Sequence, residues 1–322
     1  MPTERDEAGR SGDRPLRRRE HAACRANRLD GKAWTRSSIS VWSDIRKTPE
    51  EARLKHPAMF PAALASRLIE CFAAPGDEVV LDPFAGLGST LIAAAQAGMR
   101  GIGIELSAEY ARIARRRLAA LDDRESREQA AGSRKKGTGD PPTSCPAIHV
   151  GDARKLSRWV EPESVDLVIT SPPYWDILTR RRTADGKAIR NYGRAGADIG
   201  RIAGYDDFLA ALEQVFAQVL TALRPGKYCI PIVMDLRKHG QFYPLHADLA
   251  RRLEAIGFIY DDVIIWDRRQ EYNNLRPLGY PYVFRINKVH EFALILRKPA
   301  EKGIEPQRTQ RPQGSLEKGG HG

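Results

Sequence analysis

The chain has 322 residues, of which 42% are hydrophobic and 29% are charged, and its formal net charge is +11. This length fits one elaborated α/β domain with tails, and the apolar content is enough to build a sizeable core. The positive charge favours a polyanionic partner over an acidic small molecule, so nucleic acid is the first candidate.

Cysteine spacing and hydropathy exclude several classes of protein. The cysteines Cys24, Cys71, Cys145 and Cys229 are far apart and form no C-x-x-C pair, so we predict neither a metal site nor a disulfide framework. No basic region precedes an apolar segment and a cleavage site at the N-terminus, and no apolar run is long enough to span a bilayer. We therefore expect a soluble, cytoplasmic protein with no membrane partner.

Three polar segments set the expected domain boundaries. Residues 1–30 are rich in Arg, Glu, Asp and Gly and lack hydrophobic periodicity, which predicts a disordered basic tail. Residues 300–322 have the same character and predict a second disordered tail. Residues 122–146 are polar and end in Gly and Pro, so we expect a surface loop there. One domain over residues 31–299 is left.

Strand and helix patterns alternate through this domain. In chain order we predict a strand, a helix, a strand and a helix at 78–84, 89–99, 101–106 and 108–121. After these we predict strands at 147–152 and 164–169, a helix at 206–223, a strand at 227–235, a helix at 244–256 and strands at 259–268 and 289–298. Short apolar strands separated by amphipathic helices predict an α/β fold, with a mostly parallel twisted sheet and helices on both faces.

Chemistry-bearing residues follow the first three strands of the main domain. Gly86 and Gly88 in DPFAGLGST permit a tight turn and close approach of a ligand to the next helix. Glu105 ends the second strand about twenty residues later, where an acid can accept hydrogen bonds from ribose hydroxyls. Asp152 ends the third and could accept from an adenine amine. Together they favour a nucleoside-containing cofactor, although each alone is compatible with an ordinary turn.

The stretch TSPPYW, residues 170–175, follows the apolar run SVDLVI, residues 164–169, which predicts a strand. Proline fixes φ, lacks an N–H and pushes the preceding residue out of helical geometry, so a proline pair leaves carbonyls pointing outward on a rigid segment. The pattern is compatible with a simple strand-to-loop stop and with a loop that presents acceptors to a ligand.

Together, DPFAGLGST, GIGIELSAEYARIARRRL and TSPPYW resemble motifs of the S-adenosylmethionine-dependent DNA amino-methyltransferases. The similarity extends from about Trp34 to Pro299: SISVWSDI and KHPAMFP resemble the family's N-terminal motif, and VHEFALILRKP resembles its closing strand. The resemblance implies a Rossmann-like methyltransferase fold, with residues 31–299 as the catalytic domain, S-adenosyl-L-methionine as cofactor and double-stranded DNA as partner.

The resemblance also assigns roles to residues. The catalytic loop would be Ser171, Pro172, Pro173 and Tyr174. The expected cofactor-binding residues are Asp82, Phe84, Gly86, Gly88, Thr90, Glu105, Asp152, Lys55 and His56, with Phe60 beside the last two. The segment HPAMFP could equally be a helix-entry staple.

The expected catalytic loop suits an aromatic amine, whose lone pair is delocalised into the ring. If the Ser171 hydroxyl and the Pro172 carbonyl accept hydrogen bonds from the amine, its nitrogen is biased towards tetrahedral geometry and aimed at the methyl donor. We expect Tyr174 to stack on a base that has left the duplex, with Trp175 offering a second face. No strong base is required.

Several functional alternatives stay open. Serine in this loop is commoner in family members that methylate cytosine N4, so we favour cytosine and keep adenine N6 as the alternative. Methylation of RNA and a non-catalytic nucleic-acid-binding role are further alternatives. We expect residues 176–204 and 267–287 to contact DNA, since both mix cations, amides and aromatics. A solvated face is the alternative for Arg180, Arg181 and Arg182, and core packing against the last strand is the alternative for Tyr282 and its aromatic neighbours. A cognate restriction endonuclease is a possible partner, and the oligomeric state is unknown.

Overall fold

The computed structural model describes residues 26–54, 59–130, 146–176, 197–271, 278, 281–283 and 285–300. Lys55 and His56 lie outside the described residues, as do most of both expected tails. The greater part of the expected DNA-contacting segment at 176–204, including Arg180, Arg181 and Arg182, also lies outside them.

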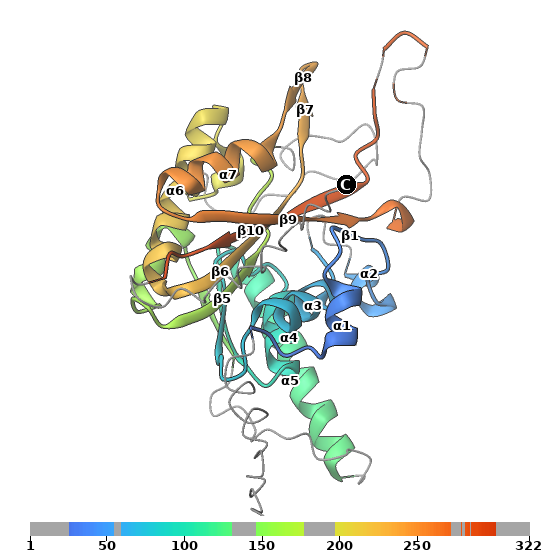
Figure 1. Ribbon diagram of the computed structural model, residues 1–322, viewed down its shortest axis with the longest axis vertical. Coiled ribbons are helices and arrows are strands. Elements are labelled where there is room, and N and C mark those ends of the chain that lie inside the picture. Colours follow the sequence, from blue (N-terminus) through green and yellow to red (C-terminus); the bar gives the residue numbers. More distant parts are fainter. Residues whose placement is uncertain are drawn as a thin grey trace, which may run out of the picture.

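The core of the molecule is one eight-stranded sheet with the order β1-β9-β10-β6-β5-β2-β3-β4 (Figure 1). Neighbouring strands are parallel except at β10, which runs antiparallel to both β6 and β9. The strands are β1 (Val41–Trp42), β2 (Val79–Asp82), β3 (Arg100–Glu105), β4 (Ala147–Val150), β5 (Val165–Thr170), β6 (Leu223–Val233), β9 (Ile259–Asp267) and β10 (His290–Arg297). The predicted α/β fold with a mostly parallel sheet is confirmed.

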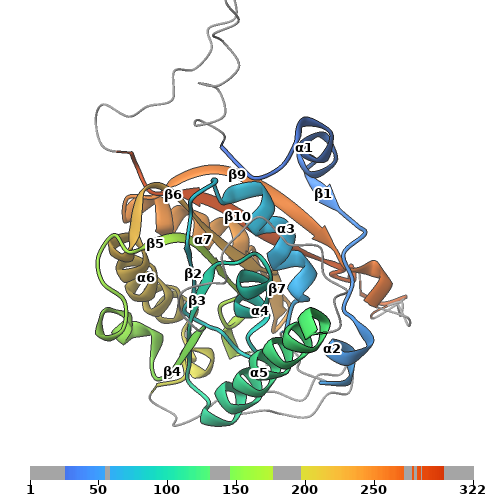
Figure 2. The ribbon, with the colours of Figure 1, turned by 90° about the horizontal axis from the view of Figure 1, so that it is seen from below.

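Helices cover both faces of the sheet (Figures 1 and 2). One face carries α3 and α4, and the other carries α6 and α7. The helices are α1 (Gly31–Ser37), α2 (Pro49–Arg53), α3 (Ala62–Phe72), α4 (Ser89–Gln96), α5 (Ala108–Ala130), α6 (Tyr205–Ala222) and α7 (Leu245–Ala255), with short 3₁₀ turns at Ala153–Arg158, Ile199–Arg201 and Arg269–Glu271.

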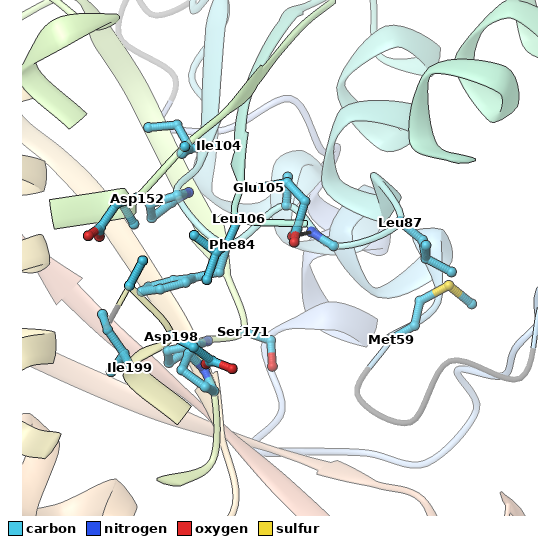
Figure 3. Close-up of a pocket in the computed structure, with 18 of the residues that line it drawn as sticks. Met59, Phe84, Leu87, Ile104, Glu105, Leu106, Asp152, Ser171, Asp198 and Ile199 are labelled. Carbon is cyan, nitrogen blue, oxygen red and sulfur yellow. Dashed lines mark hydrogen bonds between the residues drawn. The ribbon is translucent and has the colours of Figure 1, made fainter. Parts of the chain in front are cut away.

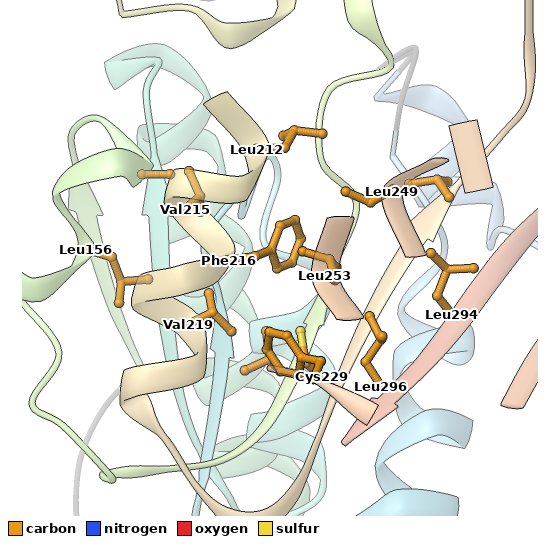
Figure 4. Close-up of a cluster of buried hydrophobic side chains, with 14 of the residues drawn as sticks. Leu156, Leu212, Val215, Phe216, Val219, Cys229, Leu249, Leu253, Leu294 and Leu296 are labelled. Carbon is orange, nitrogen blue, oxygen red and sulfur yellow. The ribbon is translucent and has the colours of Figure 1, made fainter. Parts of the chain in front are cut away.

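Successive strand residues point to opposite faces of the sheet, and this alternation divides the core in two. Leu81 belongs to the cluster under α6 and α7, while its neighbour Val80 packs under α3 and α4. Phe216 and Leu253 are fully buried in the first cluster, where α6 and α7 meet the sheet (Figure 4). Because both faces are covered, the central strands β2 and β5 are buried along their whole length.

Two local expectations differ from the structure. Helix α5 continues to Ala130, whereas we expected a loop from residue 122. The added segment DDRESREQA is polar but contains Glu, Arg, Gln and Ala, which are good helix formers, so a polar composition there does not exclude a helix. In addition, β7 (Leu236–Lys238) and β8 (Gln241–Tyr243) form a separate antiparallel hairpin that we did not predict.

The strand order reverses beside β2. From β2 the chain builds outward through β3 to β4, whereas β5 lies on the other side of β2 and leads to β6. In open α/β sheets ligands bind beyond the carboxyl ends of the strands at such a reversal. The glycine turn after β2 and the diproline loop after β5 therefore lie at the same edge of the sheet.

Among the described residues, no helix is both long and apolar enough to cross a membrane.

Candidate active site

A cavity of about 840 Å³, part of it open to solvent, lies at this reversal point (Figure 3). The walls come from the end of β3, from the segments that follow β2, β3, β4 and β5, and from Met59 and Phe60 before α3. The lining residues are Met59, Phe60, Pro83, Phe84, Ala85, Gly86, Leu87, Ser89, Ile104, Glu105, Leu106, Gly151, Asp152, Ala153, Ser171, Pro172, Pro173, Ala197, Asp198 and Ile199.

Asp82, the last residue of β2, stabilises the turn that follows it and is 1% exposed. One carboxyl oxygen accepts from the Thr170 hydroxyl at 2.6 Å and from the Phe84 N–H at 3.0 Å, and the other accepts from the Thr90 hydroxyl at 2.7 Å. Burial raises the pKa of Asp82 to about 6, against the effect of these donors. Asp82 and Thr90 do not line the cavity, and they tie the β2 turn to the end of β5.

Gly86 and Gly88 occupy the left-handed region, with φ of 52° and 79°. Gly88 precedes α4, and a Cβ there would lie 3.1 Å from the Cβ of Ala114 in α5. Of these two glycines, only Gly86 is among the residues that line the cavity. The two glycines thus have different functions in the structure: Gly86 exposes backbone to the cavity, and Gly88 lets α4 and α5 approach closely.

Glu105 fixes the other side of the turn. Its carboxylate accepts from the Gly86 N–H at 2.8 Å and from the Ser107 N–H at 2.7 Å. The residue is 6% exposed, and burial raises the pKa of its carboxyl to about 7, although both N–H groups oppose that shift. Each carboxylate oxygen has a further lone pair, so Glu105 can still accept hydrogen bonds from a ligand in the cavity.

Asp152 lines the cavity, but its carboxylate is already engaged. Arg154 forms an ion pair with it at 2.7 Å, and its backbone N–H donates to the same carboxylate at 3.0 Å. Burial raises the pKa of Asp152, but the hydrogen bonds and the charge of Arg154 outweigh it and lower the pKa overall. Asp152 therefore stays ionised at neutral pH.

The diproline loop, which follows β5 beside β2, brings Ser171, Pro172 and Pro173 to the cavity wall. Tyr174 points the other way. It is 6% exposed, and its hydroxyl lies 2.9 Å from Ser171 Oγ and 3.0 Å from Glu291 Oε2. Glu291, on β10, is 3% exposed, and its other oxygen pairs with Arg268. Burial and the Glu291 charge raise the pKa of Tyr174 well above its ordinary value.

These contacts decide which hydroxyl donates. A carboxylate only accepts hydrogen bonds, so the single hydroxyl hydrogen of Tyr174 is used on Glu291. The contact between Ser171 and Tyr174 then has the Ser171 hydroxyl as donor and the tyrosine oxygen as acceptor. With its hydrogen so directed, the lone pairs of Ser171 Oγ are available to accept from another group.

Trp175 is buried rather than presented to a ligand. It is 4% exposed and donates from Nε1 to the Ile202 carbonyl at 2.9 Å. Its ring packs against Tyr205 and Tyr243, with centroid separations of 5.1 and 5.0 Å. Stacking of Trp175 or Tyr174 on a base therefore stays a prediction, since both rings are covered here.

The sequence-predicted residues fall into three groups. Phe60, Phe84, Gly86, Glu105, Asp152, Ser171, Pro172 and Pro173 line one cavity, Asp82, Gly88, Thr90 and Tyr174 support its walls, and Lys55 and His56 are outside the described residues. Tyr282, which could have been a core residue, is 92% exposed.

Sequence reasoning missed Asp198, Met59 and Glu291. An acid inside the apolar run HEFALILR was the one available signal for Glu291. It is informative because a buried carboxylate needs partners. Nothing local distinguishes Met59 or Asp198, which reach the cavity through the tertiary fold.

A sequence model of the DNA methylase family for N6 and N4 amino groups matches residues 11–116 and 165–319, which is more than half of the chain. Among curated relatives, type II methyltransferase M.ScaI of Streptomyces caespitosus is 44% identical over 80 residues, covering 25% of this chain and 26% of the relative. Type II methyltransferase M.MjaI of Methanocaldococcus jannaschii is 30% identical over 182 residues, covering 49% of this chain and 57% of the relative.

DNA adenine methyltransferase YhdJ of Escherichia coli is 41% identical over 85 residues, covering 26% of this chain and 28% of the relative. A Thermus thermophilus protein solved with S-adenosyl-L-methionine is 31% identical, covers 49% of this chain and 58% of that chain, and superposes with a TM-score of 0.34. Each of these matches spans less than two thirds of the relative's own length.

Proposed function

This chain belongs to the DNA methylase family of N6 and N4 amino-methyltransferases, and on that premise we propose that it methylates an exocyclic amine of a base in double-stranded DNA. Residues 31–299 would form the catalytic domain and S-adenosyl-L-methionine would be the methyl donor. The observation that carries the proposal is that the Glu105 carboxylate and the Ser171-Pro172 acceptors line the same cavity.

The residues around the cavity fit this cofactor. Glu105 retains acceptor capacity for ribose hydroxyls, and Phe84, Ile104 and Leu106 offer apolar walls to a purine. Ser89 Oγ, at the start of α4, is buried and has no hydrogen-bond partner among the described residues. Such an orphaned hydroxyl beside a helix N-terminus suits the carboxylate end of the cofactor. When bound, S-adenosyl-L-methionine supplies an electrophilic methyl group.

The protein's own contribution is to position and polarise the amine. The Ser171 hydroxyl, turned towards Tyr174, leaves its oxygen free to accept from one amine hydrogen. The Pro172 carbonyl, on a segment that two prolines stiffen, would accept the other. Both acceptors raise the electron density on nitrogen without needing a strong base, because the nitrogen becomes acidic only after it has accepted the methyl group.

We propose cytosine N4 as the target, with adenine N6 as the alternative. The neutral acceptor Ser171 supports this choice, because serine in this loop is commoner in family members that methylate cytosine N4. The similarity to the adenine methyltransferase YhdJ favours the alternative. Both bases present an amine that would have to leave the duplex before it could reach the cavity.

The test is methylation of unmodified plasmid with radiolabelled cofactor, followed by nucleoside analysis of the digested DNA. We expect N4-methylcytosine, and N6-methyladenine would replace the cytosine assignment by the alternative. Ser171→Ala should lower the rate at least about 100-fold, a typical cost of removing one positioned polar group, while cofactor affinity is retained. Label in RNA and not in DNA, or full activity of Ser171→Ala, would refute the proposal.

A further inference from the structure

The hairpin β7–β8 is fixed directly to the catalytic loop. Lys238, at the end of β7, forms an ion pair with Asp176 at 2.8 Å, and its Nζ lies 3.4 Å from the ring centroid of Trp175. Tyr243, at the end of β8, packs on the same tryptophan. Asp176 and Trp175 directly follow Ser171–Tyr174 in the chain, so the hairpin is anchored on the segment that forms the cavity wall.

Arg237 and residues 239–242 of the hairpin are exposed, and the hairpin projects from the body of the protein (Figure 1). Phe242 is 40% exposed and has two cations over its ring, with Arg237 Cζ at 5.8 Å and Lys288 Nζ at 4.7 Å from the centroid. Arg237 is further held by a 2.7 Å hydrogen bond to the Gly240 carbonyl. The aromatic ring therefore holds two cations in place before any ligand arrives.

The charge of this surface has one sign. Residues 236–243 and 281–290 contain Arg237, Lys238, Arg285 and Lys288 and no Asp or Glu. Asp176 neutralises Lys238, but no ion pair joins Arg237 or Lys288 to a carboxylate in the part of the chain that the structure describes. Arginine uses one of its five N–H donors on Gly240, which leaves four for an anion.

We propose that Arg237, Lys288 and Phe242 form a phosphate-binding surface that grips the duplex backbone beside the extruded base. This inference rests on the proposed function. DNA is the occupant that the geometry favours. Arg237 belongs to the hairpin that packs on the catalytic loop, and Lys288 lies over the Phe242 ring of the same hairpin. A base bound at Ser171 must still be joined to its backbone nearby. Two preorganised cations with no acid between them suit consecutive phosphates.

The size of the effect follows from counterion release. Each phosphate contact adds a slope of about −0.9 to the dependence of log affinity on log salt, which amounts to roughly fivefold in affinity at 0.15 M salt relative to 1 M. Losing both contacts should weaken duplex binding about 30-fold at 0.15 M salt and reduce the slope by about 1.8.

The experiment compares Arg237→Gln with Lys288→Gln, singly and together, by fluorescence anisotropy on a labelled 30-base-pair duplex across a salt series. Arg100→Gln is the matched control, because Arg100 is an exposed arginine that begins β3 at the opposite edge of the sheet. Phe242→Leu removes the ring without changing the charge, and we expect it to weaken binding severalfold. Thermal melting of every variant checks that the fold is intact.

Affinity and salt slope that match the wild type in the double variant would overturn the inference, whatever the control shows. An equal loss in Arg100→Gln would also overturn it, since the effect would then be one of net charge. Methyl transfer by the wild type separates the two proposals. If the wild type methylates plasmid and the double variant binds normally, only the hairpin inference fails. Wild-type protein that neither binds nor methylates duplex DNA would overturn both.

Discussion

The buried Glu105 carboxyl makes cofactor affinity depend on pH near neutrality. Burial raises its pKa from 4.5 to about 7 in the free protein. Ribose hydroxyls that donate to the carboxylate favour its ionised form. At a pH below that pKa, cofactor binding must therefore remove a proton from Glu105. The affinity for the cofactor therefore decreases as the pH falls. Between pH 8 and pH 6 we expect about a tenfold loss, equal to about 1.4 kcal/mol.

Titration calorimetry with S-adenosyl-L-methionine from pH 6 to pH 8 measures this dependence. Glu105→Gln should bind more weakly and without this pH dependence, so it also reports any titration of the ligand itself. Asp152→Asn is the matched control at the cavity wall. Because Arg154 lowers the pKa of Asp152, that variant should keep the tenfold ratio. Equal wild-type affinity at pH 6 and pH 8 would refute the assigned contact between Glu105 and the ribose.

Two further predictions test the supports of the site. Tyr174→Phe removes the acceptor that turns the Ser171 hydroxyl, so we expect the single-turnover rate to fall about tenfold, roughly one lost hydrogen bond, with cofactor affinity unchanged. An unaltered rate would show that the tyrosine hydroxyl does not orient Ser171. Gly103→Ala places a Cβ 2.8 Å from the Cβ of Ala85, and we expect about 1–3 kcal/mol less free energy of unfolding in urea. Gly31→Ala, with no atom within 4 Å of the added Cβ, is the control, and equal stability losses would contradict the packing argument.

The edge of the sheet that carries the site could be predicted from local sequence patterns. Apolar strands that alternate with amphipathic helices require a covered parallel sheet, and parallel strands place their carboxyl ends at one edge. Motifs that follow three such strands, at Gly86, Glu105 and Ser171, were therefore expected to converge, and the structure places all three on one cavity.

The roles of Asp82 and Tyr174 could be assigned only from the tertiary structure. Sequence placed both beside a ligand, but Asp82 is hydrogen-bonded to Thr90 and Thr170 beneath the turn, and Tyr174 faces Glu291. The choice between a cavity-facing and a core-facing side chain at a strand end is decided by which neighbour supplies a partner, and that neighbour is 88 or 117 residues away in two of these contacts.

The amino-acid sequence by itself determined the α/β architecture and the order of the motifs along it, because periodicity and turn residues act within a few positions of the chain. The tertiary structure alone decided that β10 enters the sheet between β6 and β9, which brings Glu291 to Tyr174. It alone also decided that the β7–β8 hairpin packs against Trp175. These arrangements arise from packing between distant segments, whose contact energies no local pattern encodes.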